Sequence, residues 1–203
     1  MTRYLLISIG LFVFGCGSFP KNQGFTKTIS SESIIENNYF SNKNTDYVYK
    51  AQIIVYDQHF GGLLIVKKIQ ENTHRVVFTT EMGTKLFDFS FLENDFKVNY
   101  IVDDFDKGLL IKILKQDFKT LITETLNYDN QYKIGSQSIF ETSLYNKKHF
   151  YFFNNDSLVK INRTKGAKEK VSFQFSNISD SIAENITIKH YNLKLKITLK
   201  SIN

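Results

Sequence analysis

The chain has 203 residues, of which 42% are apolar, and it carries 26 basic against 20 acidic side chains. Its length allows one ordinary domain with a single hydrophobic core, and its apolar content excludes a disordered chain. The single cysteine excludes an intrachain disulfide and any site built from several cysteines, while the net charge of +6 fits either an anionic membrane surface or a compositional bias toward lysine.

Residues 1–15 are predicted to be a secretory signal peptide. Arg3 supplies a positive charge, and the uncharged stretch that follows it is too short to span a bilayer. The segment 13–16, Val-Phe-Gly-Cys, resembles a bacterial lipobox, in which the cysteine is acylated and becomes the mature N-terminus. We therefore predict lipidation of Cys16, with two or three acyl chains giving stable anchoring. The alternative is an ordinary signal peptide with an incidental cysteine.

Residues 16–46 are predicted to be the lipidated N-terminus and a tether, because they are rich in Ser, Asn, Lys and Thr. A short helix is expected over residues 31–38, capped by Ser30 or Ser31. Gly17, rather than aspartate, follows the cysteine. By the sorting rule of enterobacterial lipoproteins, this residue favours the outer membrane, with the rest of the chain facing the periplasm.

Residues 47–203 are predicted to form one domain of antiparallel strands, because apolar and polar residues alternate there. Inside the second strand, Gly61 and Gly62 indicate a bulge or a close approach of another backbone. The strands are expected at 47–55, 60–66, 75–80, 85–92 and 96–102, and then at 133–142, 148–154, 158–163, 170–176, 185–189 and 193–200.

The middle of the chain changes to a helical period. Apolar residues recur at helical spacing between residues 106 and 122, and the helix could be broken near Gln116. The sequence therefore predicts an α+β fold. It is a curved, mostly antiparallel incomplete β-barrel, covered on its concave face by one to three helices.

Motifs of enzymes and cofactor sites are missing from the sequence. The four histidines are not spaced for a zinc site, and neither a nucleophile elbow nor a phosphate loop occurs. The aspartates at 103, 104 and 106 lack the spacing of a calcium loop. We therefore expect a protein that is not an enzyme and has no cofactor or metal. The export signal argues against nucleic acid as a partner.

One turn, residues 80–84, joins the third and fourth predicted strands. Gly83 fits a hairpin position that needs a positive φ. Met82 is unusual at a hairpin tip, where polar residues are common. It either folds back onto a neighbour or makes transient contact with lipid or a varied partner.

The segment 60–92 resembles the LolA/LolB family of lipoprotein-sorting proteins, and within it the LolB-like outer-membrane receptors. The residues that carry the resemblance are 77–87, Val-Phe-Thr-Thr-Glu-Met-Gly-Thr-Lys-Leu-Phe, in which Met82 falls on the family's protruding leucine. The helix at 106–122 falls where the family has its mid-chain helices, and residues 185–199 resemble the family's last two strands. The lipobox agrees with the receptor rather than with the soluble carrier.

The resemblance implies that the chain receives lipoproteins, by their acyl chains, from a periplasmic LolA-like carrier and inserts them into the outer membrane. The hairpin of Met82 and Gly83 would contact outer-membrane lipid, and the protein would act as a monomer. A cavity for acyl chains would be lined by Phe78, Phe87, Phe89, Phe91, Phe173, Phe175, Leu195 and Ile197. Two alternatives stay open: an envelope scaffold lipoprotein of the same fold, with a filled core and no ligand, and a hydrolase or other enzyme.

Overall fold

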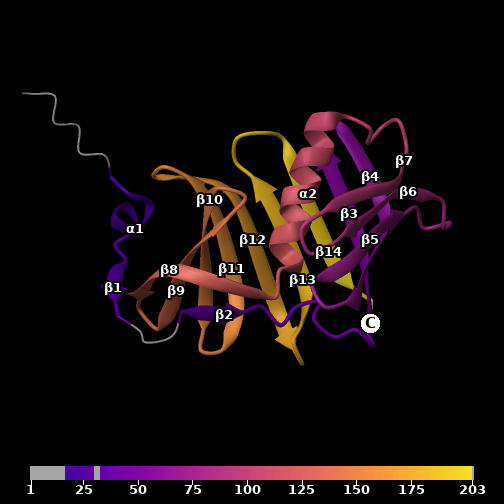
Figure 1. The fold of residues 1–203 in the computed structure, drawn as a ribbon. Helices are drawn as coiled ribbons and strands as arrows, with labels where there is room; N and C mark the ends of the chain where they lie inside the picture. The colour runs from indigo at the N-terminus through magenta and orange to yellow at the C-terminus, as the bar shows by residue number, and fades with distance from the viewer. Residues whose placement is uncertain (1–16, 30–32, 203) are drawn as a thin grey trace, which may run out of the picture.

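The computed structural model describes residues 17–29 and 33–202. The predicted signal peptide and the predicted lipidation site, Cys16, lie outside the described residues. A 14-stranded sheet and one helix of 15 residues dominate the described part. Figure 1 shows this helix, α2, lying across the inner face of the curved sheet.

The elements follow one another along the chain with short connections. The helices are α1 (Phe19–Asn22) and α2 (Gly108–Ile122). The strands that precede α2 are β1 (Thr26–Thr28), β2 (Ile34–Glu36), β3 (Asp46–Val55), β4 (Gln58–Gln70), β5 (Thr73–Thr79), β6 (Lys85–Phe91) and β7 (Phe96–Ile101). Those that follow it are β8 (Thr125–Ile134), β9 (Gln137–Leu144), β10 (Lys147–Asn154), β11 (Ser157–Lys165), β12 (Lys168–Ser179), β13 (Ile182–His190) and β14 (Leu195–Ser201).

The sheet is antiparallel and open. Its strands pair in the order β1-β8-β9-β10-β11-β12-β13-β14-β3-β4-β5-β6-β7, and no pairing joins the two ends within the described ranges. At one end, β1 pairs with β8 at residues 131–133, and β2 pairs with β8 at residues 125–127. The segment predicted as a tether thus contributes two strands, β1 and β2, which cover the edge that β8 would otherwise expose.

The inner face of the sheet carries the main core. In β3, Ala51 and Ile53 are fully buried, whereas Lys50 before them and Gln52 between them are exposed. This period of two is the pattern from which the strand was predicted. The same face of the other central strands packs against α2, so one continuous core lies between helix and sheet.

Gly62 marks a close approach of two backbones, one of the two possibilities that the sequence indicated. A Cβ atom added at Gly62 would lie 1.8 Å from the carbonyl oxygen of Thr79, whereas one added at Gly61 would meet nothing within 4 Å. Only glycine therefore fits at the inner of the two positions.

The predicted helix is confirmed as α2, which begins at Gly108 rather than at residue 106. It continues through Gln116 without the break that was considered. Its apolar stripe, with Leu114 and Phe118 fully buried, faces the sheet. Over the described residues, α2 is the only helix on the concave face, at the lower end of the predicted one to three helices. The non-helical segment with Tyr39 and Phe40 packs against the same core.

Two expectations about local structure were wrong. Where a helix was expected over 31–38, the described part contains β2, because Ile35 is buried and its backbone pairs with Leu126 of β8. The expected strand at 133–142 is a hairpin: β8 ends at Ile134, and Gly135 turns the chain with a φ of 53°. The polar composition of residues 127–131 concealed β8.

A second, smaller core lies on the outer face of the sheet. Tyr151 belongs to the main core, and its neighbour Phe150 points to the other face, where it packs against Phe19 of α1 at a ring distance of 4.8 Å. The N-terminal segment therefore docks on the outer side of β8–β10. None of the helices within the described ranges is long and apolar enough to cross a membrane.

Candidate functional site

The hairpin between β5 and β6 presents an apolar tip. Met82 is 93% exposed, and Gly83 has a φ of 85°, which confirms the predicted positive-φ position. The Thr80 N–H donates to the Thr84 carbonyl at 2.8 Å, and the Gly83 N–H donates to the Thr80 carbonyl at 3.0 Å. Met82 therefore does not fold back onto a neighbour, since a hydrogen-bonded turn holds it in solvent.

The charge beside this tip is paired. The Glu81 carboxylate lies 2.9 Å from the Lys50 ammonium of β3, and both side chains are exposed. An exposed ion pair contributes little stability, about 0–1 kcal/mol. It does, however, draw the Glu81 carboxylate back toward β3 and away from the end of the hairpin.

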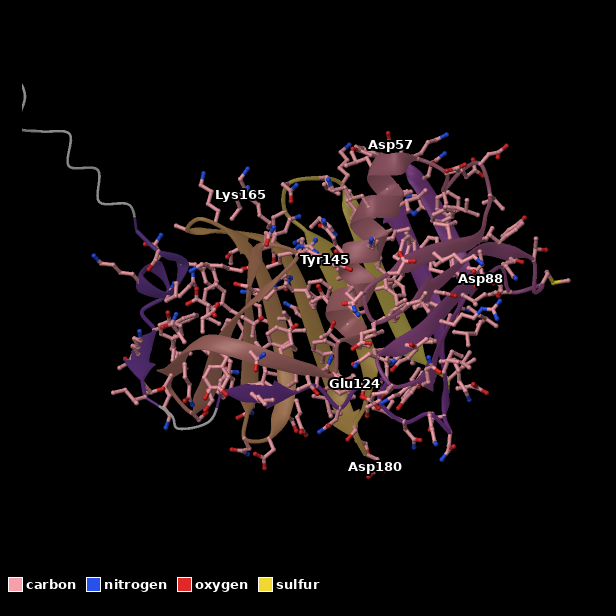
Figure 2. All side chains as sticks on the ribbon, in the orientation of Figure 1. Asp57, Asp88, Glu124, Tyr145, Lys165 and Asp180 are labelled. Atoms are coloured by element: carbon pink, nitrogen blue, oxygen red, sulfur yellow. The ribbon has the colours of Figure 1, made fainter. Side chains whose placement is uncertain are left out.

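Asp88 of β6 links the base of the hairpin to β5 and β7 by hydrogen bonds, on the face of the sheet opposite the core. Arg75 of β5 donates two hydrogen bonds to its carboxylate, at 2.9 and 2.7 Å, and Lys85 donates another at 2.9 Å. Asn99 of β7 adds a fourth at 3.1 Å. The Arg75 hydrogen bonds hold the pKa of the buried Asp88 carboxyl well below its usual range. Figure 2 shows Asp88 on the strands from which the hairpin projects.

The eight side chains predicted to line an acyl-chain cavity are brought together, but in a closed core. Phe87 and Phe89 stack at a ring distance of 4.5 Å, and Phe87 lies 5.8 Å from Phe118 of α2. Phe175 stacks on Tyr39 at a ring distance of 4.7 Å. All eight are buried in the main core: Phe78, Phe87, Phe89, Phe91, Phe173, Phe175, Leu195 and Ile197.

A buried polar cluster fastens the middle of α2 to the sheet. Asp117 is fully buried, and its two carboxylate oxygens lie 2.8 Å from Arg163 Nη2 of β11 and 2.7 Å from His190 Nε2 of β13. Removing one partner of a buried ion pair typically costs about 3–5 kcal/mol. The cluster therefore resists any movement of α2 away from the core beneath it.

The C-terminal end of α2 is held by further polar contacts. The Asn37 side chain donates to the Leu121 carbonyl at 2.8 Å, which satisfies one of the unpaired carbonyls of the last turn. Just beyond the helix, Lys68 of β4 lies 2.7 Å from the Glu124 carboxylate. Burial lowers the pKa of the adjacent His74 to about 4, so this histidine is neutral at physiological pH.

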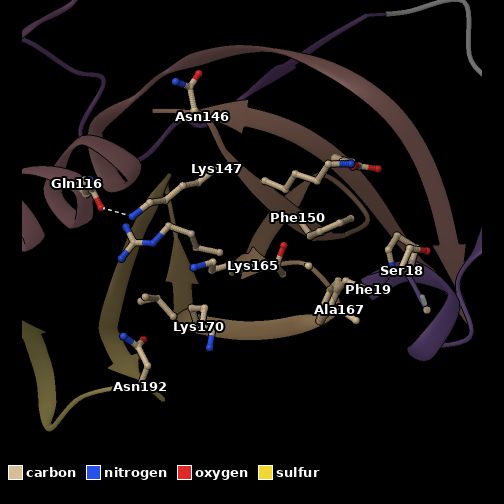
Figure 3. Close-up of a pocket in the computed structure, with 18 of the residues that line it drawn as sticks. Ser18, Phe19, Gln116, Asn146, Lys147, Phe150, Lys165, Ala167, Lys170 and Asn192 are labelled. Carbon is tan, nitrogen blue, oxygen red and sulfur yellow. Dashed lines mark hydrogen bonds and ion pairs between the residues drawn. The ribbon is translucent and has the colours of Figure 1, made fainter. Parts of the chain in front are cut away.

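A large cavity lies elsewhere, at the ends of β10–β12. It has a volume of about 1210 Å³ and runs from Gln116 on α2 to Ser18 and Phe19 of the N-terminal segment (Figure 3). None of the eight predicted cavity residues lines it. The predicted acyl-chain site and the observed cavity are therefore separate parts of the molecule.

The charged side chains that line this cavity are mostly basic. Those that line it are Lys27, Lys147, Lys148, Arg163, Lys165 and Lys170, and the one carboxylate among the lining residues is Glu141. Glu141 already accepts hydrogen bonds from Lys148, Tyr132 and Asn130. Partial burial and the nearby Arg163 charge lower the pKa of Lys147.

The sequence analysis missed this cavity because its lining comes from segments far apart in the chain. The available signals were the net charge and the lysines at 147, 148, 165 and 170, which fall at the ends of two hairpins. Neither signal shows that these hairpins and the N-terminal segment meet. Within the described ranges, no group of three acidic, histidine or cysteine side chains is placed to hold a metal ion.

Comparison with known proteins identifies the fold but no sequence family. No family model and no curated protein matches the sequence. The structure is similar to that of a LolA superfamily protein from Nitrosomonas europaea, with a TM-score of 0.55 and 8% identity over 82% of this chain and 88% of that chain. A domain from Vibrio parahaemolyticus, provisionally described as an outer membrane lipoprotein-sorting protein, has a TM-score of 0.44 and 9% identity over 78% and 83% of the two chains. The first match shows that the chain has the LolA/LolB-like fold that the resemblance implied.

Proposed function

We propose that this chain is a lipid-anchored outer-membrane protein, facing the periplasm, that receives lipoproteins and inserts them into that membrane. Three features support the proposal: the lipobox that ends at Cys16, the LolA/LolB-like fold, and the exposed Met82. The exposed Met82 is the main support for this proposal, because nothing in the core requires an apolar residue at the end of a solvent-exposed hairpin.

The tip suits brief contact with a bilayer. Burying one methionine side chain is worth about 1.5–3 kcal/mol, which is enough to favour contact but not to anchor the protein. The unbranched thioether adapts to irregular surroundings such as lipid. Because Glu81 is next to Met82, deep insertion would bring a carboxylate into hydrocarbon, so shallow contact is the geometry that the turn supports.

The proposed transfer is physical and forms no covalent bond, so it needs neither a catalytic residue nor a cofactor. The chain would take a lipoprotein from a LolA-like carrier and act as a monomer, with no nucleic acid involved. Acyl chains could reach the eight buried apolar side chains only if the residues that cover them moved outward, such as α2 over Phe87 and Tyr39 over Phe175. The Asp117 cluster would then hold the closed state. Each CH₂ group shielded from water in the open state would contribute about 0.8 kcal/mol.

A second function is favoured by one observation, the filled core. Phe87, Phe89 and Phe118 pack in ring contact, and α2 closes over them. A lipoprotein that scaffolds an envelope complex needs a stable fold and no ligand space. Such a protein would bind no acyl chain.

Depletion of the chain from cells that have no second receptor separates the two functions. If the chain is a receptor, outer-membrane lipoproteins should accumulate in the periplasm and the inner membrane, and re-expression of the wild-type chain should restore their distribution. The measurement is membrane fractionation followed by labelled-palmitate detection. An unchanged distribution would refute the receptor and leave the scaffold.

A further inference from the structure

The basic cavity at the ends of β10–β12 has more cations than its carboxylates can neutralise. Arg163 is paired with Asp117, and Lys148 with Glu141. The other cations of the lining have no carboxylate within 4.0 Å among the described residues, and they are Lys27, Lys147, Lys165 and Lys170. Lys147 instead donates a hydrogen bond to the Gln116 side-chain oxygen at 2.7 Å.

A buried and unsatisfied donor lies in the same wall. Arg163 is 5% exposed, and its Nη2 is occupied by Asp117. Its Nη1 is buried and has no hydrogen-bond partner within the described ranges, and the same is true of the hydroxyl of Thr164, its neighbour in the lining. Leaving a buried polar group without a partner destabilises the folded protein. An anionic oxygen in the cavity would remove this cost.

The lining fits a phosphate better than a smaller anion. A phosphate group offers several acceptor oxygens, which match a guanidinium together with separate ammonium groups. The cavity has a volume of about 1210 Å³, which exceeds what a single ion needs and is large enough for a whole organic ligand. Phe19, Phe150 and Leu193 add apolar surface for the carbon part of a phosphate ester.

We propose that this cavity binds a phosphate-bearing anion, held by Arg163, Lys147, Lys165 and Lys170. Two sources share this chemistry, the headgroup of an anionic phospholipid and a soluble phosphate ester. Gly17 and Ser18 line the cavity, and Gly17 follows Cys16 in the sequence. If Cys16 carries the proposed lipid anchor, headgroups lie close to the cavity. The anion site itself does not depend on that anchor or on lipoprotein transfer.

The test is calorimetric titration of the full lipidated chain in non-ionic detergent. The probes are inorganic phosphate, glycerol 3-phosphate and dihexanoyl phosphatidylglycerol, each at constant ionic strength. Binding of the lipid alone identifies a headgroup site, and binding of all three identifies a site for soluble phosphates. Both outcomes support the proposal, and an absence of binding by every probe at millimolar concentration overturns it.

A pair of variants removes charge inside and outside the cavity. The double variant Lys165→Gln/Lys170→Gln should weaken binding about tenfold or more, since it removes two charge-assisted contacts. The control Lys168→Gln removes a charge from the same hairpin at a position that does not line the cavity, and it should change affinity less than about twofold. An equal loss in both variants would show general electrostatic attraction and overturn the site. These titrations involve no lipoprotein, so they are independent of the outcome for the proposed function.

Discussion

At the scale of single residues, two side-chain choices are explained by geometry rather than by the core. Met82 is an exposed apolar residue that no packing contact requires, and this is why we propose it as a contact site for lipid. Gly62 is the opposite case, because its lack of a side chain is what allows the Thr79 carbonyl to approach. Both features were recognised in the sequence as anomalies of their local pattern.

Substituting the two adjacent glycines of β4 should have different effects. Gly62→Ala places a Cβ atom 1.8 Å from a backbone oxygen, so the strands must separate and the free energy of unfolding should fall by about 1–3 kcal/mol. Gly61→Ala meets open space and should change stability by less than about 1 kcal/mol. Urea unfolding followed by circular dichroism measures both. Equal effects of the two substitutions would mean that the close approach does not limit residue choice.

At the scale of elements, the β5–β6 hairpin and α2 are each fixed by one buried carboxylate. Asp88 joins β5, β6 and β7 on the outer face, and Asp117 joins α2 to β11 and β13 on the inner face. The hairpin is therefore a stiff support for Met82. The helix is a cover held by polar contacts as well as by its apolar stripe.

Asp88→Asn should weaken the hairpin support in a pH-dependent way. Because the folded protein holds the pKa of Asp88 below the ordinary value of about 4, the ionised carboxylate stabilises the fold above that pH, and this contribution is lost as the pH falls. At pH 7 the variant should lose about 3 kcal/mol of unfolding free energy, and its difference from wild type should shrink toward pH 3. The buried His74 and His149 titrate alike in both proteins and cancel in this difference.

The matched control is Asp57→Asn, since the Asp57 side chain is 94% exposed. It should change stability by less than about 0.5 kcal/mol at either pH. Urea unfolding at pH 7 and pH 3 provides the comparison. A loss for Asp88→Asn that is the same at both pH values would contradict the assigned role of its ionised carboxylate.

At the level of the whole molecule, the sequence predicted the central strands and the helix correctly. It did not predict the strands at the β1–β8 end of the sheet or the basic cavity at the ends of β10–β12. Alternating residues such as Ala51 and Ile53, and the helical stripe around Leu114, report burial directly, so the central strands and α2 were found. β8 was missed because it is a polar strand of which only one face meets the core. β2 was missed because its extended conformation is fixed by pairing with β8 rather than by a pattern in its own three residues. The basic cavity depends on contacts between distant hairpins, which no local pattern encodes.

The same reasoning explains the outcome for the apolar residues of the predicted cavity. Their alternation placed side chains such as Phe87 and Phe89 on the inner face, where the structure has them. Sequence does not specify whether the space above an apolar face is empty or filled, and here α2 fills it. The transfer proposal consequently depends on whether α2 can move away from this face.

The proposed function can be tested by measuring transfer of a labelled lipoprotein from a LolA-like carrier to outer-membrane lipid vesicles by the full lipidated chain. The wild-type chain and Met82→Leu should transfer at similar rates, because both keep an apolar tip. Met82→Glu should fold normally, since the tip is solvent-exposed, and transfer about tenfold more slowly, because a carboxylate opposes contact with hydrocarbon. No transfer by the wild-type chain, or an undiminished rate for Met82→Glu, would contradict the proposed role.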